Sequence, residues 1–131
     1  MHALLGIGSR ARLLRHPALG ASWEGFVVEQ LLGALAASGV DAQAHFLRTS
    51  DGYEIDLLLT VGAVTAAIEI KLSANATPQD LERLEKAADF VAAEHRYVVC
   101  QTSEPVTSAT RGVLDLASAI ERMKRLGARK K

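Results

Sequence analysis

Charged side chains interrupt two apolar stretches of the chain that otherwise have the composition of buried β-strands. Asp56 lies in the first stretch, residues 52–59, while Glu69 and Lys71 lie in the second, residues 67–72. Alternation along a strand places Glu69 and Lys71 on one face and the isoleucine between them on the other. Charged groups within apolar strands are costly unless they contact each other, a metal ion or a ligand. These three residues therefore mark the candidate functional site.

The composition predicts one soluble globular domain covering residues 1–131. The chain is 49% hydrophobic and 23% charged, which suffices for a core without disulfide or metal support. Its formal net charge is zero; this balance counts against a large phosphate-binding surface and leaves a local one open. Cys100 is the only cysteine, so an internal disulfide is excluded, and we expect an inert core thiol there.

We expect a cytoplasmic protein with no membrane partner. The apolar run after Met1 is too short for a secretory signal, and no small-residue cleavage pattern follows it. No stretch of the sequence has the length of a transmembrane helix. The single cysteine agrees with a reducing compartment.

Periodicity and turn residues predict the order helix, three strands, helix, strand and closing helix. Gly39 is the expected left-handed cap of the first long helix. Thr77 is the expected N-cap of the second, with Pro78 in its first turn. The predicted ranges are a weakly helical basic lead-in at 3–16, the first long helix at 20–38, strands at 42–48, 52–60 and 64–72, a helix opening at 77, a strand at 95–101, an extended piece at 113–116 and a last helix ending near 127.

Glu24, on the first long helix, is a further candidate residue of the site. Glu24, Val28, Leu31 and Leu35 follow the spacing of one helix face, so that Glu24 belongs to a stripe that is otherwise apolar. Glu29 falls on a more polar side of the same helix. A helix that packs this stripe against the sheet would bring the Glu24 carboxylate to the site.

Two carboxylates on neighbouring strands have the chemistry of a divalent metal site. A hard cation held by few carboxylates, usually Mg²⁺, can make a water nucleophilic and neutralise phosphate oxygens, which phosphodiester hydrolysis requires. Asp56 and Glu69 would be the metal ligands, and the backbone carbonyl of Ile70 would add an oxygen. Glu24 is a candidate further ligand or partner of a metal-bound water. Lys71 would orient the attacking water or stabilise charge.

The residues also allow simpler interpretations. Glu69 and Lys71 could form a plain ion pair on an exposed strand. Glu54 shares a strand face with Asp56 and is either a supporting carboxylate or a solvated residue. Two basic groups are either phosphate contacts or solvated surface; they consist of Arg10, Arg12 and Arg15, and of Lys124, Arg125, Arg129, Lys130 and Lys131.

In their order along the chain, these residues resemble the PD-(D/E)XK phosphodiesterase superfamily, which includes restriction endonucleases and archaeal Holliday-junction resolvases. The resemblance covers about residues 3–126 and is carried by Glu24, Asp56 and the triplet Glu69-Ile70-Lys71. It implies an α/β fold with a restriction-endonuclease-like core, in which helices flank a central mixed sheet of about four to five strands. It also implies that the four charged residues are catalytic in Mg²⁺- or Mn²⁺-dependent cleavage of DNA. Ile55 stands where the superfamily's name has a proline.

More narrowly, residues 20–27, 52–56 and 68–71 are similar to the uncharacterised C-terminal domain of a family of prokaryotic AAA+-type ATPases. In that family the domain usually follows an ATPase module and a winged-helix segment. No G-x-x-x-x-G-K-[ST] motif is present here, so we expect a free-standing or truncated terminal domain whose ATPase is a partner or a missing domain. The alternative function is a non-catalytic nuclease-like module for DNA docking or oligomerisation. Apolar positions in residues 3–14 and 113–126 predict a homodimer.

Overall fold

The structure is a computed structural model that describes residues 11–14 and 23–128, the first of these ranges by its backbone only. Within these ranges the chain forms seven strands and three helices. The strands are β1 (Ala11–Leu14), β2 (Ala42–Thr49), β3 (Glu54–Val61), β4 (Val64–Ile70), β5 (His95–Val99), β6 (Val106–Thr107) and β7 (Arg111–Leu114), and the helices are α1 (Trp23–Ala37), α2 (Pro78–Val91) and α3 (Leu116–Ala128). No helix in the described ranges is both long enough and apolar enough to cross a membrane.

The strands form one mixed sheet in the order β1-β2-β3-β4-β5-β7-β6. Strands β1 to β4 are antiparallel neighbours, β4, β5 and β7 run parallel, and β6 lies antiparallel to β7 at the edge. The predicted α/β class with a mixed central sheet is confirmed. The expectation of four to five strands is wrong, because β1 extends one edge of the sheet and the β6–β7 pair extends the other.

Strand β1 lies in a segment that the sequence predicted to be helical. It pairs antiparallel with the end of β2, from Ala11 opposite Thr49 to Leu14 opposite Phe46. Alanine, arginine and leucine favour a helix locally, but backbone pairing along an open sheet edge overrides that preference. The other residues of the expected lead-in, and residues 20–22 of the expected first long helix, lie outside the described residues.

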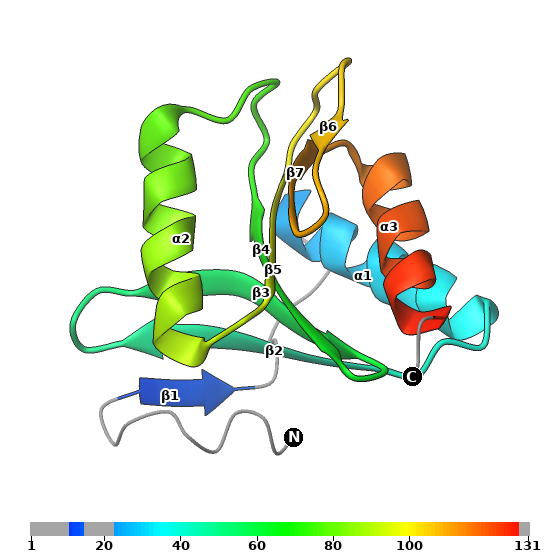
Figure 1. Cartoon of the computed structure of the whole chain (residues 1–131), viewed down its shortest axis with the longest axis horizontal. Helices are drawn as coiled ribbons and strands as arrows, with labels where there is room; N and C mark the ends of the chain where they lie inside the picture. Colours follow the sequence, from blue (N-terminus) through cyan, green and yellow to red (C-terminus); the bar gives the residue numbers. More distant parts are fainter. Residues whose placement is uncertain (1–10, 15–22, 129–131) are drawn as a thin grey trace.

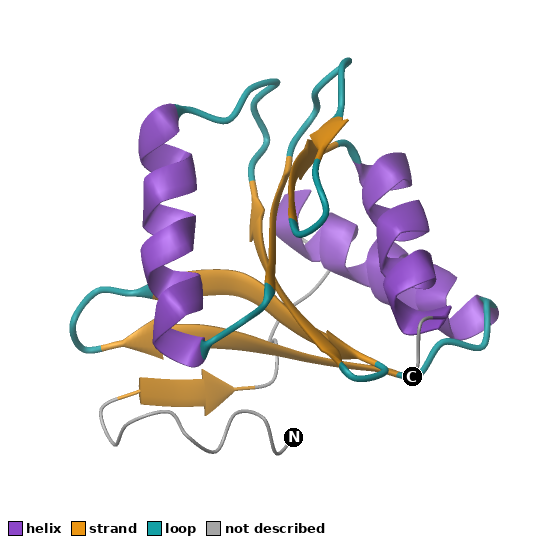
Figure 2. Cartoon of the chain, in the orientation of Figure 1, coloured by secondary structure: helices purple, strands orange, loops and turns teal. Residues whose placement is uncertain are grey.

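Helices cover both faces of the sheet (Figure 1). Helix α2 packs on one face, and α1 and α3 pack on the other (Figure 2). The core on the face of α1 and α3 includes Val27, Val28, Leu31, Leu35, Leu57, Leu59, Ile68, Val99 and Met123. The core on the face of α2 includes Leu47, Ile55, Leu58, Ala67, Leu84, Ala87, Ala88, Val91 and Val98. The predicted apolar stripe of α1 is thus confirmed as a buried face.

The helix ends follow the chemistry expected from the sequence. Gly39, two residues after α1, has a φ of +77°, which is the left-handed conformation that glycine adopts without steric cost. At the start of α2, the Thr77 hydroxyl accepts a hydrogen bond from the Asp80 N–H, and the Asp80 carboxylate accepts one from the Thr77 N–H. This reciprocal capping box fixes where α2 begins.

Strand β3 carries a β-bulge at the candidate site. The register between β2 and β3 shifts between His45 and Leu47, so that one residue of β2 faces both Asp56 and Leu57. The extra residue changes the alternation: Ile55 packs in the core under α2, whereas Leu57 packs in the core under α1 and α3. Bulges re-aim side chains in this way and are common beside active sites.

Strands β3 and β4 separate at the same place. Their antiparallel pairing ends at Leu57 and Ile68, and Figure 1 shows β3 and β4 diverging from one another. From there β3 stays beside β2, while β4 stays beside β5 as far as Ile70. The sheet therefore forks, with Asp56 on one branch and Glu69 on the other.

Replacing Leu31 by Ala should destabilise the fold, because Leu31 is fully buried in the core under α1 and α3. Such a change removes apolar contacts and leaves a cavity, so we expect a loss of about 2–5 kcal/mol in the free energy of unfolding, measured by denaturant titration. Leu72→Ala is the control: Leu72 is 62% exposed, and its removal should cost less than about 1 kcal/mol. Equal losses in the two variants would contradict the described packing.

Candidate functional site

The Asp56 carboxylate occupies the fork of the sheet. Its Oδ2 atom accepts a 2.8 Å hydrogen bond from the backbone N–H of Ile70 on the other branch. The side chain thus replaces the strand partner that Ile70 loses where β3 leaves β4. The N–H and C=O of one residue point the same way from an extended strand, so the Ile70 carbonyl faces the same side of β4. Two of the expected oxygen ligands therefore lie on one side of this strand.

Burial and neighbouring carboxylates raise the pKa of Asp56 from 3.8 to about 7. Burial is the largest cause; the hydrogen bond from Ile70 acts against it, and the charges of Glu24, Glu69 and Glu54 raise the pKa further. These glutamates come from α1, β4 and β3, so carboxylates of three elements act on Asp56. A carboxyl group whose pKa is raised by burial and by like charges is typical of functional sites.

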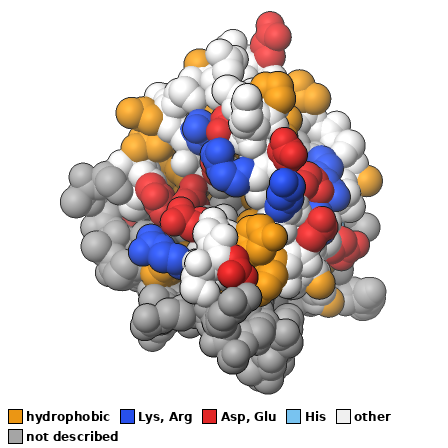
Figure 3. All heavy atoms as spheres, turned by 90° about the vertical axis from the view of Figure 1, so that its left-hand side faces the viewer, with side chains coloured by type: hydrophobic (Ala, Val, Ile, Leu, Met, Phe, Trp, Pro, Cys, Tyr) orange, Lys and Arg blue, Asp and Glu red, His pale blue; other side chains and the backbone are white. Residues whose placement is uncertain are grey.

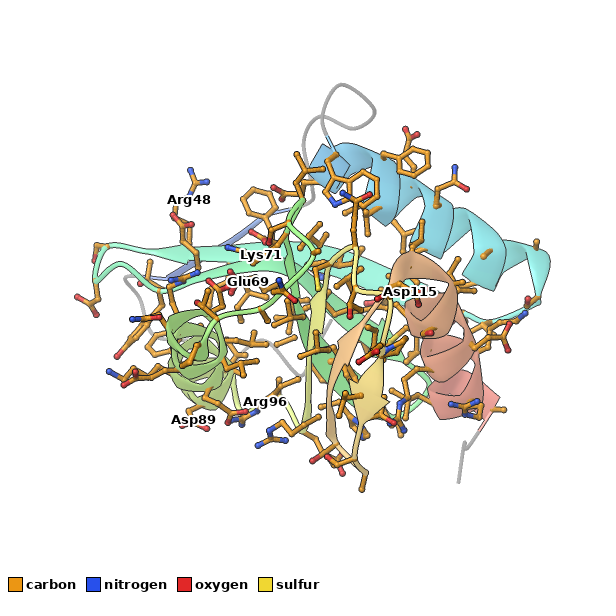
Figure 4. The ribbon with its side chains drawn as sticks, turned by 90° about the horizontal axis from the view of Figure 1, so that it is seen from above. Arg48, Glu69, Lys71, Asp89, Arg96 and Asp115 are labelled. Carbon is orange, nitrogen blue, oxygen red and sulfur yellow. The ribbon has the colours of Figure 1, made fainter. Side chains whose placement is uncertain are left out.

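Glu69 and Lys71 lie close to one another beside α2 (Figure 4). The Lys71 ammonium group donates to Oδ1 of Asp80 at 3.2 Å. Arg83 donates to Oε2 of Glu69 and to Oδ1 of Asp80, at 2.9 Å each. Two acidic and two basic residues thus form one connected network between the end of β4 and the first turns of α2.

Asp80 is one of two residues of this network, with Arg83, that the sequence does not mark as part of the site. It is only 4% exposed, and its pKa is lowered to about 2, mainly by the hydrogen bond from the Thr77 N–H. Burial acts against this shift, while hydrogen bonds from Lys71, the Thr77 hydroxyl and Arg83 add to it. The capping pattern in the sequence signalled the bond to Thr77, but the pairing with Lys71 depends on how α2 packs against β4.

The first residue of α1 ties that helix to the end of β4. The indole N–H of Trp23 donates a 3.1 Å hydrogen bond to the backbone carbonyl of Lys71, and its ring stacks on Phe26 with centroids 5.6 Å apart. This contact places Glu24, the next residue, at the same end of the sheet as Lys71. It explains why a glutamate of α1 affects the pKa of Asp56.

The candidate ligands are oxygen atoms, which suit a hard divalent cation, but they do not form a preformed metal site. Carboxylate and carbonyl oxygens are the ligands that Mg²⁺ takes, and the negative charges of Glu24, Glu69 and Glu54 that act on Asp56 favour a positive charge there. Among the described residues, no group of three or more His, Cys, Asp or Glu side chains is arranged to hold a metal ion. One oxygen of Glu69 is engaged by Arg83, and one oxygen of Asp56 by Ile70.

Glu54, Cys100, Lys124 and Arg125 lie outside this network. Glu54 lies on the surface and pairs with Arg48 across β2 and β3 at 3.7 Å. Cys100 is buried, as predicted, and burial raises the pKa of its thiol. Lys124 pairs with Glu121 at 3.4 Å, and Arg125 is exposed. The remaining members of the two basic groups lie outside the described side chains: Arg10, Arg12, Arg15, Arg129, Lys130 and Lys131.

The molecular surface around α2 carries charges of both signs. Figure 3 shows acidic and basic side chains next to one another on this side of the molecule. A cavity of about 570 Å³ lies elsewhere, between the second half of α1 and the start of β2. Recognition of a charged ligand at the fork would therefore depend on a few local groups.

Comparison with known proteins places the chain in a family. Residues 19–118 match the family described as Domain of unknown function (DUF4143), a range that includes Glu24, Asp56, Glu69 and Lys71. The chain belongs to this family. It is also similar to the uncharacterized proteins Rv2008c of Mycobacterium tuberculosis and Mb2031c of Mycobacterium bovis, with 37% identity over 112 residues in each case. The match covers 78% of this chain and 24% of each relative, so this DUF4143 chain spans about a quarter of their length.

Replacing Asp56 by Asn should make stability less dependent on pH. The carboxyl group ionises near 3.8 in the unfolded chain and near 7 in the fold. Between these values only the folded state keeps the proton, so the wild type loses stability as pH rises. Asparagine can still accept the Ile70 hydrogen bond without titrating. The variant should therefore gain a few kcal/mol over wild type between about pH 4 and about pH 8, as measured by denaturant unfolding.

Glu54→Gln is the matched control, because it removes a carboxylate from the same strand at a side chain that is 61% exposed. Its stability difference from wild type should change little over the same pH range. A parallel pH profile of Asp56→Asn and wild type would contradict the raised pKa of the partly buried Asp56.

Replacing Asp80 by Asn should have the opposite pH dependence. The lowered pKa of Asp80, about 2, means that its ionised form stabilises the fold fully above about 3.8, and that this contribution disappears as pH falls through about 2. Asparagine keeps the shape of the cap, but it lacks the negative charge that attracts Lys71 and Arg83. We expect a loss of about 2 kcal/mol at pH 6 that shrinks below about pH 4. A constant difference from pH 6 to pH 3 would show that the charge of Asp80 is not what stabilises the fold.

Proposed function

We propose that this DUF4143 domain has a restriction-endonuclease-like core and is a Mg²⁺- or Mn²⁺-dependent nuclease domain acting on DNA. The observation that carries the proposal is the contact of the Asp56 carboxylate with the Ile70 N–H. It brings the aspartate of one strand to the peptide that follows Glu69 on the next strand. The effect of the Glu24 and Glu69 charges on the pKa of Asp56 adds support, because these three carboxylates come from separate elements.

Each residue of the site has a defined part in this proposal. Asp56, Glu69 and the carbonyl oxygen of Ile70 would hold the ion, and Glu24 would be a further ligand or would bind a metal-bound water. The chemistry that a bound Mg²⁺ or Mn²⁺ supplies is activation of a water and neutralisation of charge on the phosphate oxygens. Lys71 would orient that water or stabilise charge, and Asp80 holds its ammonium group on the α2 side of the site.

DNA is the proposed substrate because the catalytic pattern resembles that of enzymes acting on DNA. The formal net charge of the chain is zero, so attraction to phosphates would come from single basic groups near the fork. Among the described residues, Arg83 is well placed for this, since it lies beside Glu69 and its side chain is 55% exposed. A planar guanidinium can bind phosphate oxygens through two parallel hydrogen bonds.

A non-catalytic module is the second candidate function. It is favoured by the ion pairs of Glu69 and Lys71 with residues of α2, which compensate both charges without a metal ion. Such a nuclease-like scaffold would dock DNA or mediate self-association within a larger system that includes an AAA+-type ATPase. The mycobacterial relatives are about four times as long as the matched segment, which leaves room in those proteins for further domains.

A cleavage assay with matched variants tests the proposed nuclease activity. The protein is incubated with Mg²⁺ or Mn²⁺ and with single-stranded, duplex and branched DNA. Cleavage should occur, and it should fall at least about a hundredfold in Asp56→Ala and Lys71→Ala, because each removes a proposed metal-binding or charge-stabilising group. Glu54→Ala should keep most of the activity, since Glu54 is exposed and pairs with Arg48.

Circular dichroism checks that each variant is folded before its activity is compared. Absence of cleavage by folded wild-type protein on all three substrates with either metal would contradict the proposed activity. DNA binding or self-association without cleavage would then favour the non-catalytic module.

A further inference from the structure

One nitrogen of Arg83 lies between two carboxylates of the candidate site. Its Nη2 atom is 2.9 Å from Oε2 of Glu69 and 2.9 Å from Oδ1 of Asp80. The side chains of Glu69 and Asp80 are 16% and 6% exposed, whereas that of Arg83 is 55% exposed. The guanidinium group thus reaches in from the surface and places a positive charge on a proposed metal ligand.

The start of α2 fixes this position. Thr77 and Asp80 form the capping box, Leu84 is buried in the core under α2, and Arg83 lies between these two anchors along the helix. Arg83 shares the Oδ1 acceptor of Asp80 with Lys71, which donates to the same atom at 3.2 Å. Two cations on one oxygen repel each other, and this repulsion favours the contact of Arg83 with Glu69.

We propose that Arg83 is a resident counter-charge that competes with a divalent cation for Glu69. The inference rests on the proposed function, because it requires Glu69 to be a metal ligand. A guanidinium and a divalent ion on the same carboxylate repel each other, so each weakens the binding of the other to Glu69. Ion binding therefore favours the release of Arg83 from Glu69. The freed guanidinium then binds Asp80 alone or a phosphate oxygen of the substrate.

Removal of the Arg83 charge has two consequences of opposite sign. Without metal, Glu69 loses its counter-charge beside Asp56, and the fold is less stable. With metal, the ion no longer competes with Arg83 for Glu69. It therefore binds more tightly and stabilises the fold by more than it does in the wild type. A purely structural ion pair would produce only the first of these effects.

Calorimetric titration of the full chain with Mn²⁺ tests the competition. The wild type is compared with Arg83→Gln, which removes the charge but keeps most of the side-chain length. Lys86→Gln is the control, because Lys86 lies on the same helix, is exposed and pairs with Glu82 at 3.6 Å. We expect the Kd for Mn²⁺ to fall about three- to tenfold in Arg83→Gln and to stay within about twofold in Lys86→Gln. Glu69→Gln, added to Arg83→Gln, should abolish the gain.

Thermal unfolding with and without Mn²⁺ provides the second measurement. Arg83→Gln should have a lower Tm than wild type without metal and a larger rise in Tm on addition of Mn²⁺. If Arg83→Gln does not fold, Arg83→Lys keeps a charge at this position with fewer donors and should bind Mn²⁺ more tightly than wild type by a smaller factor.

The outcomes separate this inference from the proposed function. Wild-type protein that binds Mn²⁺ while Arg83→Gln binds it equally or more weakly would overturn the competition and leave the proposed metal site standing. No binding of Mn²⁺ by the folded wild type or by any folded variant would overturn the metal site itself, and the competition with it. Tighter binding by Arg83→Gln alone, lost again with Glu69→Gln, supports both.

Discussion

The hydrogen bond from the Ile70 N–H to the Asp56 carboxylate is the contact on which the rest of the site depends. Where β3 and β4 part, the sheet would otherwise leave a buried backbone donor without a strand partner, at a cost comparable to a lost hydrogen bond. A side chain can accept a hydrogen bond from this donor only if it lies within the fork. There it loses water and comes near Glu24 and Glu69, and its pKa rises to about 7. The geometry that completes the sheet therefore also creates the unusual electrostatics of the site.

The opposite side of the site depends on a helix cap. Asp80 accepts from the Thr77 N–H, as a capping residue does, and its carboxylate also receives Lys71 and Arg83. One buried group thus determines both where α2 begins and where two basic side chains of the site lie. Charges held in this way by hydrogen bonds in a poorly hydrated place need little reorganisation when a charged ligand binds. Secondary structure and electrostatic organisation are consequently inseparable at this end of the molecule.

Much of the scaffold could be predicted from the sequence, because its signals are local. Apolar alternation, turn residues and the capping pattern predict most of the helices and strands. The cost of burying charge predicts that Asp56 and Glu69 belong to a functional site. The bulge and the fork could not be predicted, since a register shift depends on which strands meet and on how each core is filled. Strand β1 was missed because edge pairing overrode local helix propensity. The link from Asp80 to Lys71 is a contact between elements, and no spacing in the sequence encodes it.

The ion pairs of α2 are compatible with both candidate functions, and for a physical reason. A site that gathers several carboxylates must be stable before any ion arrives, or the fold would lose stability through like-charge repulsion. Arg83 and Lys71 provide that compensation, one on Glu69 and both on Asp80. A catalytic domain needs the compensation to be exchangeable, so that an ion can replace a side chain, whereas a scaffold benefits from a permanent pair. The exposed position of Arg83 and its division between two acceptors favour exchange, because a half-solvated guanidinium loses little when it leaves one carboxylate for another partner.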